Sequence, residues 1–355
     1  MNTTTATGTL DAPPTPAVPD AMPAAMPAAA QDAARRFDPI GWLRRNRQDL
    51  ALPLMFVGAL LVFSLQAPGF LTADNLTNMA RQSVYLLIVA LGQLIVLIGG
   101  GLDLSIGMVV SLTSVTSATV MAAVYAAQPE APWLAIAAGT AVGLAIGCIV
   151  GLVNGLGSTL LKIPPFMMTL GMSSVLFGIT LLVSGGVPIY GLPPELGEVF
   201  GFGEFLGIPV PALVAVALVA ATYVLLEWSR FGRHLYATGG NLRAAELSGV
   251  RTGRVLVVSF MLSGVMGVIT GLLLTARLDT GEANIGTNLP LESIAACVIA
   301  GVSLAGGQGR TLKVLLGTLL IMLVGNGLNL MQVGAYAQTM SIGAILIFAM
   351  ALARH

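Results

Sequence analysis

The chain has 355 residues, of which 56% are hydrophobic and only 9% are charged, whereas about 25% of residues are charged in a typical soluble domain. This composition excludes a soluble globular protein and predicts helices embedded in lipid. The formal net charge is zero, and no run of basic residues is long enough to follow a phosphate backbone, so nucleic acid is excluded as a partner.

The first 34 residues are rich in Ala, Pro and Thr. Repeated prolines and the lack of apolar bulk predict that residues 1–34 form a disordered tail. An arginine cluster at 35–47 precedes the first apolar run, and no small-residue cleavage site follows that run, so it is not a secretory signal. The expected organisation is a tail followed by a transmembrane domain over 35–355.

Ten apolar runs have, or nearly have, the length of about 20 residues that crosses a bilayer. They lie at 50–66, 84–98, 104–126, 132–157, 166–184, 210–228, 254–275, 291–305, 312–331 and 337–353. The second and eighth are short. A cytoplasmic N-terminus leaves only Arg81 and Arg277, among 16 basic residues, on the outer side, as the positive-inside rule requires. The sequence predicts an all-α membrane protein with about ten transmembrane helices and both termini in the cytoplasm.

The fourth run carries glycines at strict four-residue spacing. Membrane helices associate through close backbone approach, which small residues at this spacing permit. We therefore expect a packing ridge formed by Gly139, Gly143, Gly147, Gly151 and Gly155.

The segment GGGLDLSIG at 99–107 breaks the helical pattern between the second and third runs. Asp103 within it is interpreted as the only acidic side chain deep in an apolar stretch. The favoured interpretation is that Asp103 caps the next helix near Ser105. The alternative is a polar group in a transport path or a proton relay, because a charge at this depth is costly and usually faces protein or water.

Further polar or aromatic side chains lie near the breaks and are candidates for a translocation path. With Asp103 they form the set Gln93, Ser105, Phe166, Thr169 and Asn326. The intramembrane amides Asn154, Asn326 and Asn329 are more typical of hydrogen bonds between helices.

The polar loop at 229–253 predicts a docking element for a cytoplasmic partner. Gly239 and Gly240 are expected to break the chain, Asn241 to cap a short helix, and Gly249 to end it. The remaining contact candidates within this helix are Arg243, Ala244, Ala245 and Glu246.

Several chemistries are absent from the sequence. Neither Lys162 nor Lys313 belongs to a phosphate-binding loop, and no zinc or dinucleotide motif is present. Cys148 and Cys297 lie in apolar runs, which indicates neither a disulfide framework nor a metal site. Catalysis by this chain is not expected.

Four stretches resemble, in order and spacing, the permease subunits of ribose-type ABC sugar importers. They read GGGLDLSIGMVVSLTSV (99–115), KIPPFMMTLGMSSVLFGITLLVSGG (162–186), ATGGNLRAAELSGV (237–250) and AGVSLAGGQGRTLKVLLGT (300–318). The resemblance covers the chain from about residue 50 to the end. It implies a bacterial inner-membrane bundle with an inverted repeat, which works by alternating access and has no cofactor of its own.

The resemblance also implies partners. These are a second permease copy or a sister permease, two cytoplasmic ATPase subunits that bind ATP and Mg, and an extracytoplasmic binding protein that delivers a sugar. Residues 241–249 would form the coupling helix, with Arg243 and Glu246 as polar contacts. The outer loops at 185–209 and 276–290 would face the binding protein through Glu195, Glu198, Glu204, Arg277, Asp279 and Glu282.

Two alternatives stay open at this stage. A proton-coupled secondary transporter would use Asp103 as its proton carrier and would need no ATPase. A membrane scaffold would anchor a cytoplasmic complex and transport nothing, but glycine breaks at membrane depth argue against a passive anchor.

Overall fold

A computed structural model describes residues 2–3, 47–334, 337, 340 and 343–344. Almost all of the predicted tail and most of the last predicted run, 337–353, lie outside these residues. From Asp49 onward the chain belongs to one compact unit.

The described residues are almost entirely helical, which confirms the predicted all-α membrane class. A short hairpin of β1 (Glu204–Phe205) and β2 (Ile208–Pro209) is antiparallel, and Phe205 faces Ile208 across it. The α-helices are α3 (Arg47–Gln66), α4 (Ala73–Ile98), α5 (Ile106–Ala127), α6 (Pro132–Thr159), α7 (Pro165–Ser184), α8 (Pro194–Leu196), α9 (Val210–Tyr223), α10 (Arg230–Gly240), α11 (Leu242–Leu247), α12 (Thr252–Leu278), α13 (Leu289–Ile299) and α14 (Thr311–Leu330). Two π-helical turns lie at Gly197–Gly201 and Val224–Trp228.

Seven helices among the described residues are long and apolar enough to cross a membrane, and two shorter apolar helices, Leu50–Gln66 and Leu289–Ile299, accompany them. The expectation that the second span is short is wrong, because α4 has 26 residues. Its first ten residues are mostly polar and exposed, so they do not belong to the apolar run at 84–98. The eighth span is short as expected: α13 has 11 residues.

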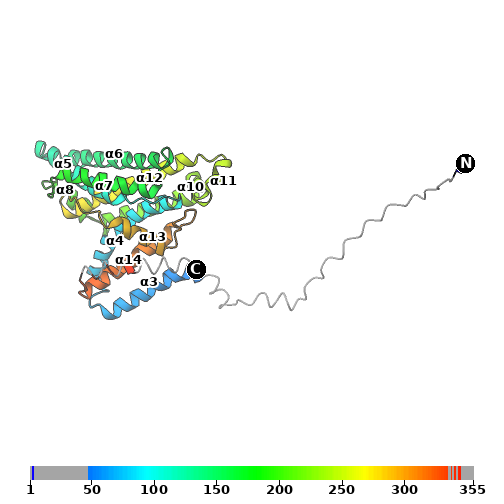
Figure 1. Cartoon of the computed structure of the whole chain (residues 1–355). Coiled ribbons are helices and arrows are strands. Elements are labelled where there is room, and N and C mark those ends of the chain that lie inside the picture. The colour runs from blue at the N-terminus through cyan, green and yellow to red at the C-terminus, as the bar shows by residue number, and fades with distance from the viewer. Residues whose placement is uncertain (1, 4–46, 335–336, 338–339, 341–342, 345–355) are drawn as a thin grey trace. The chain divides into compact units, whose positions relative to one another are not determined.

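Helices α5, α6, α7 and α12 run along one another, and α4 packs against α12 (Figure 1). The C-terminal part of α4, residues 83–98, is buried along its whole length, which is unusual for a span that faces lipid. The core of the bundle is therefore built around α4 and α12.

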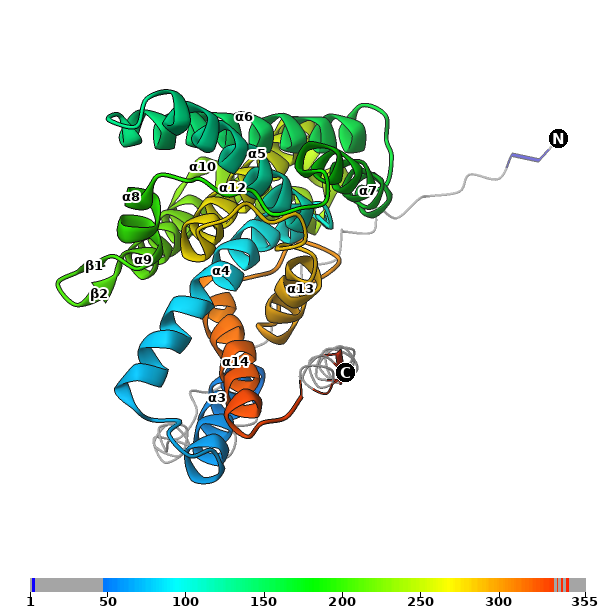
Figure 2. The same cartoon turned by 90° about the vertical axis from the view of Figure 1, so that its left-hand side faces the viewer.

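Helices α3 and α14 form a second group beside α4, and α14 packs against α4 (Figure 2). Phe63 of α3, Phe70 of the turn between α3 and α4, and Leu323 of α14 are buried together. The rings of Phe63 and Phe70 stack with centroids 5.9 Å apart. Asn75 and Asn326 exchange two side-chain hydrogen bonds of 3.0 Å. These contacts tie α14 to the start of α4.

The glycine ridge of α6 lies on its buried face. A Cβ on Gly151 would come within 2.5 Å of the Met261 Cα, and one on Gly155 within 2.6 Å of the Val257 Cα, both on α12. A Cβ on Gly143 would approach α5 instead, 3.0 Å from the Thr113 Cγ2. Backbones approach this closely only because the side chains are absent.

Two helices begin inside the bundle after non-helical segments, which we name the first break (residues 99–105, before α5) and the second break (residues 279–288, before α13). The breaks follow α4 and α12, which run in opposite directions. The two breaks meet where α5 and α13 begin. A Cβ on Gly107 would lie 2.7 Å from the Pro290 ring, and Gly107 and Gly286 each crowd the other's carbonyl oxygen. Gly267, near the middle of α12, approaches Ile106, so both helix starts lie at mid-depth in the bundle.

The two predicted outer loops contact each other. Ile189 and Gly281 exchange backbone hydrogen bonds of 3.0 and 2.9 Å. The guanidinium of Arg277 lies 4.5 Å from the centre of the Phe202 ring, and Arg81 forms an ion pair with Glu204. The loops therefore form one joined surface at this end of the bundle.

Candidate functional site

The first break is held by its own acidic side chain. Asp103 is 2% exposed, and its Oδ1 accepts hydrogen bonds from the Ser105 backbone N–H (2.9 Å) and the Ser105 hydroxyl (2.7 Å). Its Oδ2 accepts one from the Ser263 hydroxyl of α12 (2.7 Å). Asp103 thus caps the start of α5. The three hydrogen bonds satisfy both oxygens of the buried carboxyl group and hold it in place.

Two more helices attach to the same break. Asn154 of α6 donates through Nδ2 to the Ser105 Oγ (2.8 Å). The hydroxyl of Thr169 on α7 donates to the Leu102 carbonyl (2.9 Å) and accepts from the Leu104 N–H (3.1 Å). Backbone groups that the break leaves unpaired inside the bundle are therefore satisfied by side chains of neighbouring helices.

The structure does not bring the six path candidates together. Asp103, Ser105 and Thr169 share the network at the first break, whereas Asn326 pairs with Asn75. Phe166 is 49% exposed at the start of α7. Gln93 is fully buried on α4, and neither its Nε2 nor its Oε1 has a hydrogen-bond partner in the described part of the chain.

The short helix predicted in the polar loop at 229–253 is α11. The Asn241 Oδ1 accepts from the Ala244 N–H (2.9 Å), and Gly249 ends it with a φ of 81°. Ala245 is buried against the protein, while Leu242 and Leu247 are 49% and 77% exposed. Leucines presented to solvent on a capped helix give a partner an apolar surface to cover.

Polar side chains of α11 pair with each other or with the next turn. Arg243 and Glu246 form a 3.4 Å ion pair, and Thr252 donates to Glu246 (3.4 Å). Ala244 is exposed beside them.

The expected chain break at Gly239 and Gly240 is wrong, because both residues are the last turn of α10. Gly239 instead allows a close approach. A Cβ there would collide with the Ile98 carbonyl oxygen and lie 2.7 Å from the Gly307 nitrogen. Gly240 has no atom within 4 Å of such a Cβ, so the neighbouring glycines have different surroundings.

Gly239 belongs to a meeting point of three backbones, which we name the glycine junction (Gly100, Gly239, Gly306 and Gly307). The Gly307 N–H donates to the Ile98 carbonyl (2.9 Å). A Cβ on Gly306 would lie 2.9 Å from both the Gly100 Cα and the Gly239 oxygen. The junction joins the end of α10, directly before α11, to the first break and to the α13–α14 loop.

Tyr236 of α10 also binds the α13–α14 loop. Its hydroxyl donates to the Gly309 carbonyl (2.8 Å). Burial, followed by the negative charge of Glu227, raises the pKa of Tyr236 to about 12, although Arg310 acts in the opposite direction. The phenol therefore stays a hydrogen-bond donor at neutral pH.

The interpretation of Asp103 as the only deep acidic side chain is wrong. Glu292 lies in the first turn of α13, which begins at mid-depth beside Gly107. The sequence signal for this second acid is the single glutamate in LPLESIAACVI, at the start of a short apolar run.

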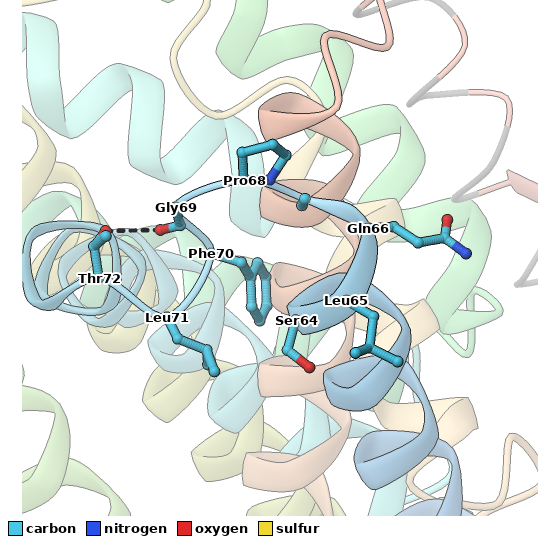
Figure 3. A pocket seen from close by; sticks show the side chains of 9 residues that line it. Ser64, Leu65, Gln66, Pro68, Gly69, Phe70, Leu71 and Thr72 are labelled. Carbon is cyan, nitrogen blue, oxygen red and sulfur yellow. Dashed lines mark hydrogen bonds between the residues drawn. The ribbon is translucent and has the colours of Figure 1, made fainter.

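One shallow depression lies at the turn between α3 and α4, lined by residues 64–72 (Figure 3). The Thr72 hydroxyl donates to the Gly69 carbonyl (2.7 Å) there. Its lining carries no charged side chain, and the feature is a gap in a chain bend.

Known proteins resemble this chain over most of its length. Residues 75–350 match the family described as the branched-chain amino acid transport system / permease component. The ribose import permease protein RbsC of Bacillus subtilis (strain 168) is 39% identical over 83% of this chain and 89% of that protein. The probable ABC transporter permease protein YphD of Escherichia coli (strain K12) is 37% identical over 87% and 90% of the two chains. No solved structure matches.

A third relative is the D-allose transport system permease protein AlsC of Escherichia coli (strain K12), which is 33% identical over 82% of this chain and 86% of its own. Members of the family are non-catalytic membrane subunits, in agreement with the missing phosphate-binding loop. Membership also removes the proton-coupled carrier and the passive scaffold as alternatives. The chain belongs to the permease family of ABC transporters and is a multi-pass membrane subunit of such a transporter.

Proposed function

We propose that this permease imports a monosaccharide, ribose-like or a related neutral sugar, across the bacterial inner membrane by alternating access. Support comes from relatives that are named for ribose and D-allose transport. A neutral sugar needs hydrogen-bonding groups and no counter-ion along its path. Gln93, buried with unused donors and an acceptor, is the described path candidate with hydrogen-bonding capacity to offer.

The observation that carries the coupling part of the proposal is the glycine junction. Helix α11 presents Leu242 and Leu247 to solvent, and the preceding helix touches the first break and the α13–α14 loop directly. A cytoplasmic ATPase that binds α11 would therefore act on the first break and on the α13–α14 loop at once. ATP and Mg belong to that ATPase in this proposal.

The topology of the proposal has ten spans with both termini in the cytoplasm, and the chain works beside a second permease copy or a sister permease. The joined outer loops receive an extracytoplasmic sugar-binding protein. Acidic side chains on these loops suit a basic patch on that partner.

An inverted repeat is supported by matching motifs in the two halves. The first break contains Asp-Leu-Ser-Ile-Gly at 103–107, and the second contains Glu-Ala-Asn-Ile-Gly at 282–286. Each follows a long helix, and α4 and α12 run in opposite directions. The two motif glycines, Gly107 and Gly286, touch each other, which is where a two-fold axis between the halves would pass.

The test is reconstitution of the chain in vesicles with its ATPase and its soluble binding protein. We expect ATP-dependent uptake of labelled D-ribose, D-allose or D-galactose that persists when the proton gradient is collapsed. Leu247→Asp should release the ATPase, whereas Leu304→Asp, on an exposed leucine outside α11, should not. Uptake that stops with the proton gradient while ATP is intact would refute the proposal.

A further inference from the structure

The β1–β2 hairpin presents large apolar side chains on the surface of the protein. Phe205, Leu206 and Ile208 are 63%, 87% and 47% exposed. Phe205 and Ile208 face each other across the two strands, so both side chains lie on one side of the hairpin, and Leu206 and Gly207 form its tip. Adjacent apolar side chains exposed in this way mark a surface that another protein or a membrane covers.

The backbone at the tip does not call for a leucine. Leu206 and Gly207 have φ values of 54° and 76°, as in a two-residue hairpin turn that favours Asn-Gly or Asp-Gly. A leucine rarely adopts a positive φ. A polar residue would suit both this turn and contact with water better, so apolar surroundings of the tip give a physical reason for the leucine.

The base of the hairpin is fixed to the bundle. Glu204, the one charged residue of the hairpin, forms an ion pair with Arg81 of α4. The Val210 N–H donates to the Gly203 carbonyl (2.8 Å). A hairpin of two strands is marginally stable in water by itself, so these contacts hold its direction. The tip beyond them, residues 205–208, carries no charge.

The hairpin adjoins a helix at the edge of the bundle. Helix α9 begins at Val210 and opens one of the candidate membrane spans. Leu206 precedes Val210 by four residues, so the tip lies within about 14 Å of the start of that span. Only three of the 14 residues of α9 are buried, and Val216 is 66% exposed. Figure 2 shows the hairpin projecting from the bundle beside α9.

We propose that the tip of the hairpin, residues 205–208, inserts into the interfacial layer of the lipid bilayer and anchors the first turn of α9 there. The headgroup level of a bilayer accepts aromatic rings, and the acyl boundary below it accepts the aliphatic side chains of Leu206 and Ile208. The exposed apolar surface of the hairpin thus continues that of α9. A soluble partner would gain specificity from charged groups, which the tip lacks. The anchor does not depend on the solute that the permease carries.

The test places a fluorescent label at the tip. Leu206→Cys, in a chain whose Cys148 and Cys297 are replaced by alanine, is labelled with a nitrobenzoxadiazole dye, and the transporter is reconstituted in vesicles. We expect blue-shifted emission that is quenched by lipids carrying a nitroxide and resists quenching by aqueous iodide. Val216→Cys, on the exposed side of α9, is the lipid-facing control. Glu130→Cys, at an exposed charged residue of the α5–α6 loop, is the water-facing control.

Two results would overturn the proposal. Quenching of the Leu206→Cys label by iodide alone, as expected at Glu130→Cys, would show that the tip lies in water. Protection from both quenchers would show that a protein, either a second copy of the chain or the soluble binding protein, covers the tip. If Leu206→Cys is not recovered folded, Phe205→Cys gives the same readout from the neighbouring position. The measurement needs neither sugar nor ATP, so its result is independent of the uptake assay.

Discussion

Exchange of Gly239 for alanine tests whether the glycine junction transmits motion from α11. The added methyl group would collide with the Ile98 carbonyl oxygen and approach the Gly307 nitrogen at 2.7 Å. It would therefore separate the two groups that now share the 2.9 Å hydrogen bond from Gly307 to Ile98. Gly240→Ala is the matched control, because that position is open.

The expected changes in the free energy of unfolding differ in sign between Gly239→Ala and Gly240→Ala. Overpacking costs about 1–3 kcal/mol, and loss of the hydrogen bond costs about 1 kcal/mol more. Replacing glycine by alanine in a helix returns up to about 1 kcal/mol. We expect Gly239→Ala to lower the free energy of unfolding by about 1–3 kcal/mol, and Gly240→Ala to leave it unchanged or slightly raised.

The assay combines thermal unfolding in detergent with ATP-driven uptake in vesicles. Gly239→Ala should reduce uptake per ATP hydrolysed while the ATPase stays bound, because α11 keeps its exposed leucines while the end of α10 loses its close contact with Ile98 and the α13–α14 loop. Gly240→Ala should transport normally. Equal uptake and equal stability of the two variants would show that the junction neither constrains the fold nor transmits motion.

Three further predictions concern other contacts. Ser263→Ala removes the donor to the second oxygen of Asp103 and should destabilise the protein by about 1–3 kcal/mol in thermal unfolding; an unchanged midpoint would refute the anchoring role of that carboxyl group. Gly151→Val should prevent recovery of folded protein, since its Cβ meets the α12 backbone at 2.5 Å, whereas Gly171→Val, on a face with no atom within 4 Å, should be recovered normally. The raised pKa of Tyr236, about 12 against an ordinary 10.0, favours the neutral phenol in the folded state. The stabilisation of the folded state by the Tyr236 phenol should be complete below pH 10 and be lost between pH 10 and 12. Unfolding midpoints of the natural protein and Tyr236→Phe, compared across that range, check this.

Patterns in the sequence predict features that depend on neighbours along one helix. The spacing of the α6 glycines places all five on the buried face. The capping role of Asn241 follows from its place before LRAAEL, and the structure shows the hydrogen bond to Ala244. Asp103 caps the start of α5 for the same local reason.

Contacts between distant segments could not be read in this way. The sequence indicates Asn326 as a path candidate, but its partner is Asn75, 251 residues away along the chain. The sequence predicts a chain break at Gly239, whereas the structure places the Ile98 carbonyl oxygen and the Gly307 nitrogen against this glycine. In the sequence Glu292 is one polar residue in a short apolar run, and only the tertiary structure places the start of α13 at mid-depth.

The sequence by itself determines that this protein belongs in a membrane, where most of its spans begin and end, and which positions lack the side chains that would keep backbones apart. These properties follow from hydrophobicity, helical periodicity and the allowed backbone angles of single residues. The tertiary structure decides which backbones use those approaches, which polar groups satisfy one another and where both breaks meet. Such pairings depend on the relative placement of helices far apart in the chain, and no local period encodes that placement.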